Sequence, residues 1–142
     1  MPKGVYPKGP RRGMWKPEAP YKRIWRNAHY QAGGLSFDNF MIFCKQNCHY
    51  CGAQPRRTNP YAQSYEAFMK RKGAIACNYT PEWFETQFVY VNGIDKKIPT
   101  DNYLDLSNLL PCCTDCNFAK GTFTYDEFIA HITKIYHFRK AA

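Results

Sequence analysis

The sequence predicts a small α+β domain that holds a zinc ion and follows a basic, extended segment. Two Cys-x-x-Cys pairs, Cys48 with Cys51 and Cys113 with Cys116, are the first observation behind this prediction. Their two-residue gap lets both thiolates of a pair bind one tetrahedral metal ion. The second observation is that apolar residues recur at helical spacing in several segments, whereas residues 88–91 (FVYV) read as one short β-strand. The third is residues 1–23, which contain five prolines, three glycines and seven Lys or Arg residues.

The overall composition is that of one globular domain with a polyanionic partner. The chain has 142 residues, of which 44% are apolar, so a single core is expected. No apolar run approaches the roughly 18 residues of a membrane span, so no membrane partner is expected. The net charge of +9 favours nucleic acid as the partner. Seven cysteines and no secretory leader pattern favour zinc over disulfides, in a reducing intracellular compartment.

Residues 1–23 are not expected to form a helix or a core, because proline lacks a donor and glycine loses much entropy on ordering. They are interpreted either as a solubilising tail or as an extended arm that neutralises phosphates, with the domain following at 24–142. The residues expected to contact nucleic acid are Lys3, Lys8, Arg11, Arg12, Lys16, Lys22, Arg23, Arg26, Arg56 and Arg57.

Four helices are expected before the β run. The first spans 21–32 and ends at a Gly-Gly pair, and the second spans 37–46 with Ser36 as its N-cap. The CHYCG turn and a loop over 54–63 follow. A short helix is then expected within SYEAFMKRKG, and Thr80 is expected to cap a helix in PEWFETQ.

The C-terminal third is expected to contain a hairpin and two helices. The run at 88–91 with the following Asn92-Gly93 predicts a strand and a turn, with a return strand starting at Ile94. A short helix is predicted over 114–120, with Gly121 just beyond its C-terminus. Thr124 and Glu127 form a capping box for a final helix. The apolar residues expected to form the buried stripe of that helix are Phe128, Ile132, Ile135 and Tyr136.

Several of these motifs occur in an order that resembles the His-Asn-His (HNH) endonucleases of bacteriophages. They are CxYCG, NGID, NLLPCCTDCNFAK and the capped YDEFI segment, and the resemblance covers roughly residues 24–137. It implies a zinc-stabilised ββα-metal core of the HNH or treble-clef-like kind, with flanking helices. In that family the zinc is structural, and the matching ligands here are Cys48, Cys51, Cys113 and Cys116.

The resemblance also implies a second, catalytic metal, usually Mg²⁺. The family holds it with an acidic or histidine side chain on the hairpin and a His or Asn on the helix, which correspond here to Asp95 and Asn117. Oxygen ligands of this kind suit magnesium, as thiolates suit zinc. The middle residue of the motif corresponds to Asn108, which in the family braces the loop of the catalytic base. Lys120 matches a basic residue near the scissile phosphate.

The sequence departs from the family at the general base. The family has a histidine directly after the acidic residue, and this chain has Lys96, where related phage sequences carry arginine. The ordinary lysine pKa of about 10.4 keeps this side chain protonated at neutral pH, so Lys96 cannot abstract a proton from water. Loss of a general base costs on the order of 100- to 10,000-fold in rate, part of which a metal-bound hydroxide can recover.

Two functions are favoured by the sequence, and a regulatory zinc module is a third, less favoured alternative. The first is a structural, catalytically impaired protein of a large RNA or ribonucleoprotein assembly, such as an organellar ribosome in the mitochondrial matrix, where it contacts neighbouring proteins. The missing histidine and the basic composition with 21 Tyr and Phe residues favour it. The second is a phage-type magnesium-dependent nicking endonuclease that acts on DNA in the host cytoplasm. The retained residues Asp95, Asn108, Asn117 and Lys120 favour it.

Overall fold

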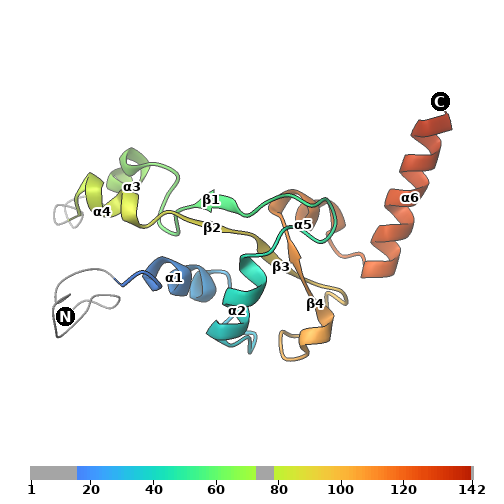
Figure 1. The fold of residues 1–142 in the computed structure, drawn as a ribbon, viewed down its shortest axis with the longest axis horizontal. Helices are drawn as coiled ribbons and strands as arrows, with labels where there is room; N and C mark the ends of the chain where they lie inside the picture. Colours follow the sequence, from blue (N-terminus) through green and yellow to red (C-terminus); the bar gives the residue numbers. More distant parts are fainter. Residues whose placement is uncertain (1–15, 73–78, 142) are drawn as a thin grey trace.

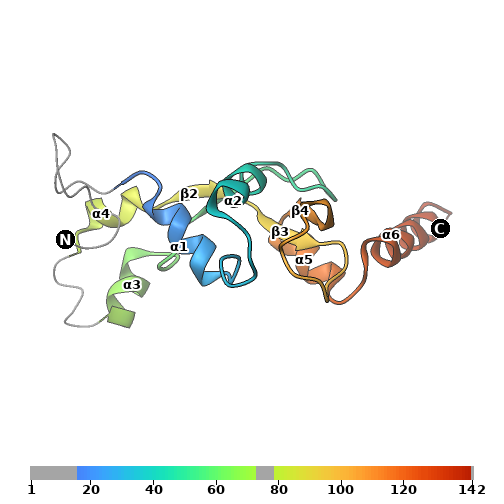
Figure 2. The same cartoon turned by 90° about the horizontal axis from the view of Figure 1, so that it is seen from below.

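The computed structural model describes residues 16–72 and 79–141. Within these residues the fold is α+β, as predicted, with six α-helices and two small antiparallel sheets. The elements are α1 (Ala19–Asn27), α2 (Phe37–Cys44), β1 (Arg56–Thr58), α3 (Tyr65–Lys72), α4 (Pro81–Thr86), β2 (Val89–Val91), β3 (Gly93–Lys96), the 3₁₀ turn η2 (Leu106–Asn108), β4 (Leu109–Cys112), α5 (Thr114–Lys120) and α6 (Tyr125–Ala141). The molecule is elongated, with α3 and α4 at one end and α6 at the other (Figures 1 and 2). None of the described helices has the length and apolar character needed to cross a membrane.

The first helix differs from its predicted range at both ends. Most of the predicted arm, residues 1–15, lies outside the described residues, but its last part is helical because α1 starts at Ala19. Pro20 is tolerated in the first turn, where a missing N–H breaks no intrahelical bond. The helix ends at Asn27, before the predicted residue 32. The chain then turns back, and the ring of Tyr103 lies so close to Gly33 that a side chain at position 33 would overlap it.

The predicted helix caps are confirmed. The hydroxyls of Ser36 and Thr80 accept backbone N–H groups three residues further on, at 3.2 and 3.1 Å. Thr124 and Glu127 each accept the backbone N–H of the other, which is a capping box. Gly121 has a φ of 52° after the last residue of α5, a conformation that favours glycine. These short-range signals mark where α2, α4 and α6 begin and where α5 ends.

The predicted hairpin around Asn92-Gly93 is wrong. Strand β2 pairs with β1, which lies in the segment predicted as a loop, and β3 pairs with β4. Asn92 is buried between the two sheets, where its side-chain amide donates to the carbonyls of Gln46 and Ala53 at 2.9 and 3.1 Å. Its backbone N–H donates to the Cys44 carbonyl at 2.8 Å. These bonds hold the residue as a link between the two sheets and not as a tight turn.

Two apolar clusters stabilise the described residues. The first packs α1 and α2 against both sheets, with Phe40 and Leu35 almost fully buried. The second is an aromatic cluster of α3 and α4 around Phe68, together with Trp83 and Phe84. Arg23 of α1 connects the two regions, because its guanidinium carbon lies 4.1 Å from the centroid of the Tyr61 ring.

The last helix is not covered by the rest of the chain. Of its predicted buried stripe only Phe128 is buried, whereas Ile132, Ile135 and Tyr136 are 40%, 49% and 55% exposed. Both views show α6 projecting from the end of the molecule (Figures 1 and 2). The prediction of a buried stripe was therefore wrong beyond the first turn, because no other described element reaches this part of α6.

Candidate metal centre

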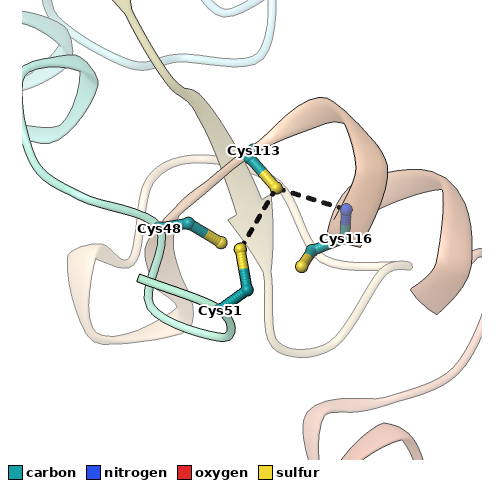
Figure 3. A group of neighbouring side chains, drawn as sticks. All are labelled: Cys48, Cys51, Cys113 and Cys116. Atoms are coloured by element: carbon teal, nitrogen blue, oxygen red, sulfur yellow. Dashed lines mark hydrogen bonds between the residues drawn. The ribbon is translucent and has the colours of Figure 1, made fainter. Parts of the chain in front are cut away.

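Four cysteines converge between the CHYCG turn and the start of α5. The sulfur atoms of Cys48, Cys51, Cys113 and Cys116 all lie within 4.8 Å of one another and point into one space (Figure 3). The sulfurs of Cys51 and Cys113 are 3.7 Å apart. Zinc bound to four thiolates at about 2.3 Å requires sulfur–sulfur separations of about 3.8 Å. A disulfide requires about 2.05 Å, so this geometry suits a metal ion and not a bridge.

Backbone hydrogen bonds hold the two cysteine pairs in place. The Cys48 N–H donates to the Ala53 carbonyl at 2.8 Å and closes the CHYCG turn. The neighbouring His49 N–H donates to the Pro111 carbonyl at 2.8 Å, which fixes this turn against β4. Cys113 is the N-cap of α5, and its sulfur accepts the Cys116 N–H at 3.4 Å. A metal at this centre would link the turn, the β3–β4 pair and α5.

The cluster has one cysteine that loses its proton readily. Burial raises the pKa of Cys48, but backbone N–H groups of Cys113, Cys51 and Tyr50 oppose this and lower the pKa to about 6. Burial raises the pKa of Cys113 and of Cys116, and hydrogen bonds among the thiols keep their protons within the cluster. A metal that binds here must displace the protons of the remaining thiols.

The carboxylate of Asp95 on β3 is surrounded by groups of the chain itself. The Tyr50 hydroxyl donates to Oδ2 at 2.7 Å, and the Lys120 ammonium lies 3.3 Å from Oδ1. The Lys120 ammonium also donates to the Lys96 carbonyl at 2.9 Å. The side chains of Lys120 and Asp95 are only 1% and 7% exposed. The sequence predicted Lys120 near a scissile phosphate, but the structure places it in the interior as the partner of Asp95.

Two other residues implied by the resemblance lie at a pocket beside Asp95. Asn117 of α5 and Lys96 line it together with Asp95, and its volume is about 360 Å³. The Lys96 ammonium lies 5.0 Å from the centroid of the Tyr103 ring, which lines the same pocket. The predicted magnesium ligands Asp95 and Asn117 are thus brought to one pocket, with Lys96 in its wall.

Asn108 braces the loop that follows β3. Its buried side chain accepts the Ile98 N–H at 3.0 Å and donates to the Ile98 carbonyl at 3.4 Å. The Asn108 carbonyl accepts the Lys97 N–H at 2.7 Å. This is the position in which the resemblance expects a bracing asparagine.

The basic residues predicted to contact nucleic acid fall into different environments. Lys3, Lys8, Arg11 and Arg12 lie outside the described residues, and Lys16 lies just before α1. Lys22 and Arg26 of α1 and Arg56 of β1 are exposed. Arg56 also lines a pocket of about 760 Å³, together with Ile24 and Gln54. Three of the four cysteines of the metal centre, Cys51, Cys113 and Cys116, line the same pocket.

Two of the predicted arginines are engaged within the protein. The Arg57 guanidinium pairs with the Glu85 carboxylate and stacks 3.6 Å from the centroid of the Phe88 ring. Arg23 stacks on Tyr61, as described above. Both side chains therefore connect elements of the fold.

Sequence reasoning missed two tyrosines of the site. Tyr50 lies within the CHYCG motif, and burial together with the Asp95 carboxylate raises its pKa, so the hydroxyl stays protonated and donates to that carboxylate. Its position between Cys48 and Cys51, two candidate metal ligands, was the available signal. Tyr103, which contacts Lys96 across the pocket, has no comparable signal in the sequence.

The CHYCG turn, the β3–β4 pair and α5 together therefore carry two features. One is a thiolate site whose ligands suit zinc, and the other is a pocket with oxygen ligands of the kind that suit magnesium. In comparisons with known proteins, no family model, no curated protein and no solved structure matched this chain.

Proposed function

We propose that this chain is a zinc-stabilised nucleic-acid-binding protein with an HNH-like hairpin and helix that does not support efficient cleavage. Its role is structural, as a component of an RNA or ribonucleoprotein assembly. The observation that carries the proposal is the Asp95 carboxylate, whose two oxygens are held by the Tyr50 hydroxyl and the Lys120 ammonium.

These contacts disfavour a catalytic metal at Asp95. A divalent cation on this carboxylate would lie beside the buried Lys120 ammonium, and the two positive charges would repel each other strongly in a medium of low dielectric constant. Displacing Lys120 would instead leave a buried ammonium without its counter-charge. The general base is missing as well, because Lys96 is a lysine that lies beside the Tyr103 ring.

The β1–β2 ribbon supports binding to a single-stranded nucleic acid. Tyr90 of β2 is 61% exposed and is paired in register with Arg57 of β1. Bases of single strands stack on exposed aromatic rings, while exposed guanidinium groups bind the phosphates between them. Arg56, next along β1, supplies such a group on the opposite face of the ribbon, where it lines the 760 Å³ pocket together with Val91. RNA is the proposed partner because its single-stranded loops offer unstacked bases.

Binding and nicking can be measured side by side on the same zinc-loaded protein. Fluorescence anisotropy with a labelled single-stranded RNA and a labelled DNA duplex reports binding, and a supercoiled plasmid with Mg²⁺ reports nicking. The proposal expects RNA binding that weakens with salt, and no nicking by the wild type, Lys96→His or Asn117→Ala. Strong wild-type nicking that Asn117→Ala abolishes would contradict the structural role. Failure to bind either nucleic acid would contradict the proposal as a whole.

A nicking endonuclease is the second candidate, favoured by one observation. Asp95, Lys96 and Asn117 line the same pocket, although they lie on β3 and α5. If this pocket is an active site limited by its missing base, Lys96→His should raise magnesium-dependent nicking by at least about tenfold. The matched control is Lys97→His, because Lys97 follows directly in the chain but is not among the residues that line the pocket.

A further inference from the structure

The exposed part of α6 is an apolar surface that nothing in the described chain covers. Its first turn is held by Phe128, whose ring centroid lies 5.1 Å from that of Tyr50, and by the Tyr125 N–H, which donates to the Lys97 carbonyl at 2.8 Å. Beyond this turn Ile129, Ile132 and Ile135 are 37%, 40% and 49% exposed. An apolar helix face of this kind, rimmed by polar residues, marks an interaction surface.

The order of residues along this face is symmetric. Residues 129–135 read Ile-Ala-His-Ile-Thr-Lys-Ile, so an isoleucine lies three residues away on each side of Ile132. A second α6 placed antiparallel, with a two-fold axis at Ile132, brings Ile129 of each copy opposite Ile135 of the other. Two-fold interfaces require such a self-complementary surface, because each contact occurs twice with the residues exchanged.

The charges of α6 favour the same arrangement. Its first turn carries Asp126 and Glu127, and its last turn carries Arg139 and Lys140. Antiparallel pairing places the acidic end of each helix beside the basic end of the other and opposes the two helix dipoles. Parallel pairing would place like charges together at both ends.

We propose that α6 pairs with α6 of a second copy of this chain, antiparallel and with the two-fold axis at Ile132. This inference goes beyond the proposed function and does not depend on it. The 17 residues of α6 extend about 25 Å, so the contact is smaller than a standard protein interface. The dimer is therefore a weak one, with a dissociation constant on the order of 1–100 μM.

Sedimentation equilibrium of the zinc-loaded chain over a wide concentration range tests the proposal. The mass should rise from 16.6 kDa towards twice that value as the concentration increases. Ile132→Asp should hold the protein as a monomer, because the axis would place two carboxylates face to face. Ala130→Asp is the matched control, since Ala130 lies on the opposite side of the helix and should leave dimerisation unchanged. Circular dichroism and zinc content verify that each variant is folded.

Mixing oppositely charged variants then tests the orientation. Ile129→Asp mixed with Ile135→Lys should restore a heterodimer, because these positions face each other only in the antiparallel arrangement. Ile129→Asp mixed with Ile129→Lys should not, since these positions face each other only in a parallel pair. A wild type that is monomeric at every concentration, or a dimer that survives Ile132→Asp, would overturn the proposal. Restoration by the second mixture alone, or by neither, would overturn the antiparallel register.

Discussion

Replacing Lys120 with methionine should destabilise the fold severely, even though lysine is usually a surface residue. Methionine keeps the length of the side chain but removes the ammonium that pairs with Asp95 and donates to the Lys96 carbonyl. The Asp95 carboxylate would then stay buried as a negative charge, with the Tyr50 hydroxyl as its remaining partner among these contacts. Breaking a buried ion pair from one side costs about 3–5 kcal/mol. For a chain of this size that lowers Tm by roughly 10–15 °C.

Thermal melting of the zinc-loaded protein, followed by circular dichroism, measures this loss. The matched control is Lys70→Met, because Lys70 lies 3.5 Å from Glu66 in a pair whose side chains are 79% and 82% exposed. Such a surface pair contributes at most about 0.5 kcal/mol, so its loss should barely change Tm. The double variant Asp95→Asn with Lys120→Met removes both charges and should lose less stability than the sum of the two single variants.

One outcome would refute this reasoning. If Lys120→Met melts within about 2 °C of the wild type but weakens nucleic-acid binding, Lys120 faces a phosphate and not Asp95. That result would also remove the main argument against a catalytic metal at Asp95, and it would favour the nicking endonuclease.

Two further predictions concern the metal and the bound nucleic acid. Cys116→Ser, or treatment of the wild type with a strong chelator, should abolish the cooperative melting transition, because a structural zinc supplies folding free energy directly. Unchanged melting would exclude a structural role for zinc. Arg56→Ala should lower the slope of log K for nucleic-acid binding against log salt concentration by about one charge. Arg57→Ala should leave this slope unchanged and reduce stability, because Arg57 pairs with Glu85 and stacks on Phe88. Equal slope changes for both variants would contradict this division.

The parts of the fold that the sequence predicted correctly depend on short-range chemistry. Thr80 caps α4, and Gly121 ends α5, because each acts on backbone groups within a few residues of itself. The two cysteine pairs belong to the same class, since the spacing within each pair sets which way its sulfurs point. The meeting of the two pairs was predicted because four thiolates complete one tetrahedral site.

The parts that could not be predicted depend on contacts between distant segments. Asn92-Gly93 has the composition of a hairpin turn, but long-range hydrogen bonds from Asn92 to Gln46 and Ala53 decide its conformation. Arg57 was predicted from its charge to bind phosphate, but its observed partners Glu85 and Phe88 lie about thirty residues further along the chain. The spacing of apolar residues in α6 predicts an apolar face, but it does not reveal whether the chain itself covers that face.

The burial of Lys120 follows from the metal centre and could have been inferred from spacing. Lys120 lies four residues after Cys116 in α5, so both side chains project from the same face of the helix. A metal that holds Cys116 against the CHYCG turn therefore directs Lys120 towards the β3–β4 pair, where the Asp95 carboxylate lies 3.3 Å away. A motif specifies residue types, whereas the orientation of the helix decides whether Asp95 binds a metal or an ammonium. If zinc binds the four cysteines, the sulfur ligands set that orientation, and the metal centre then favours the ion pair over a catalytic magnesium.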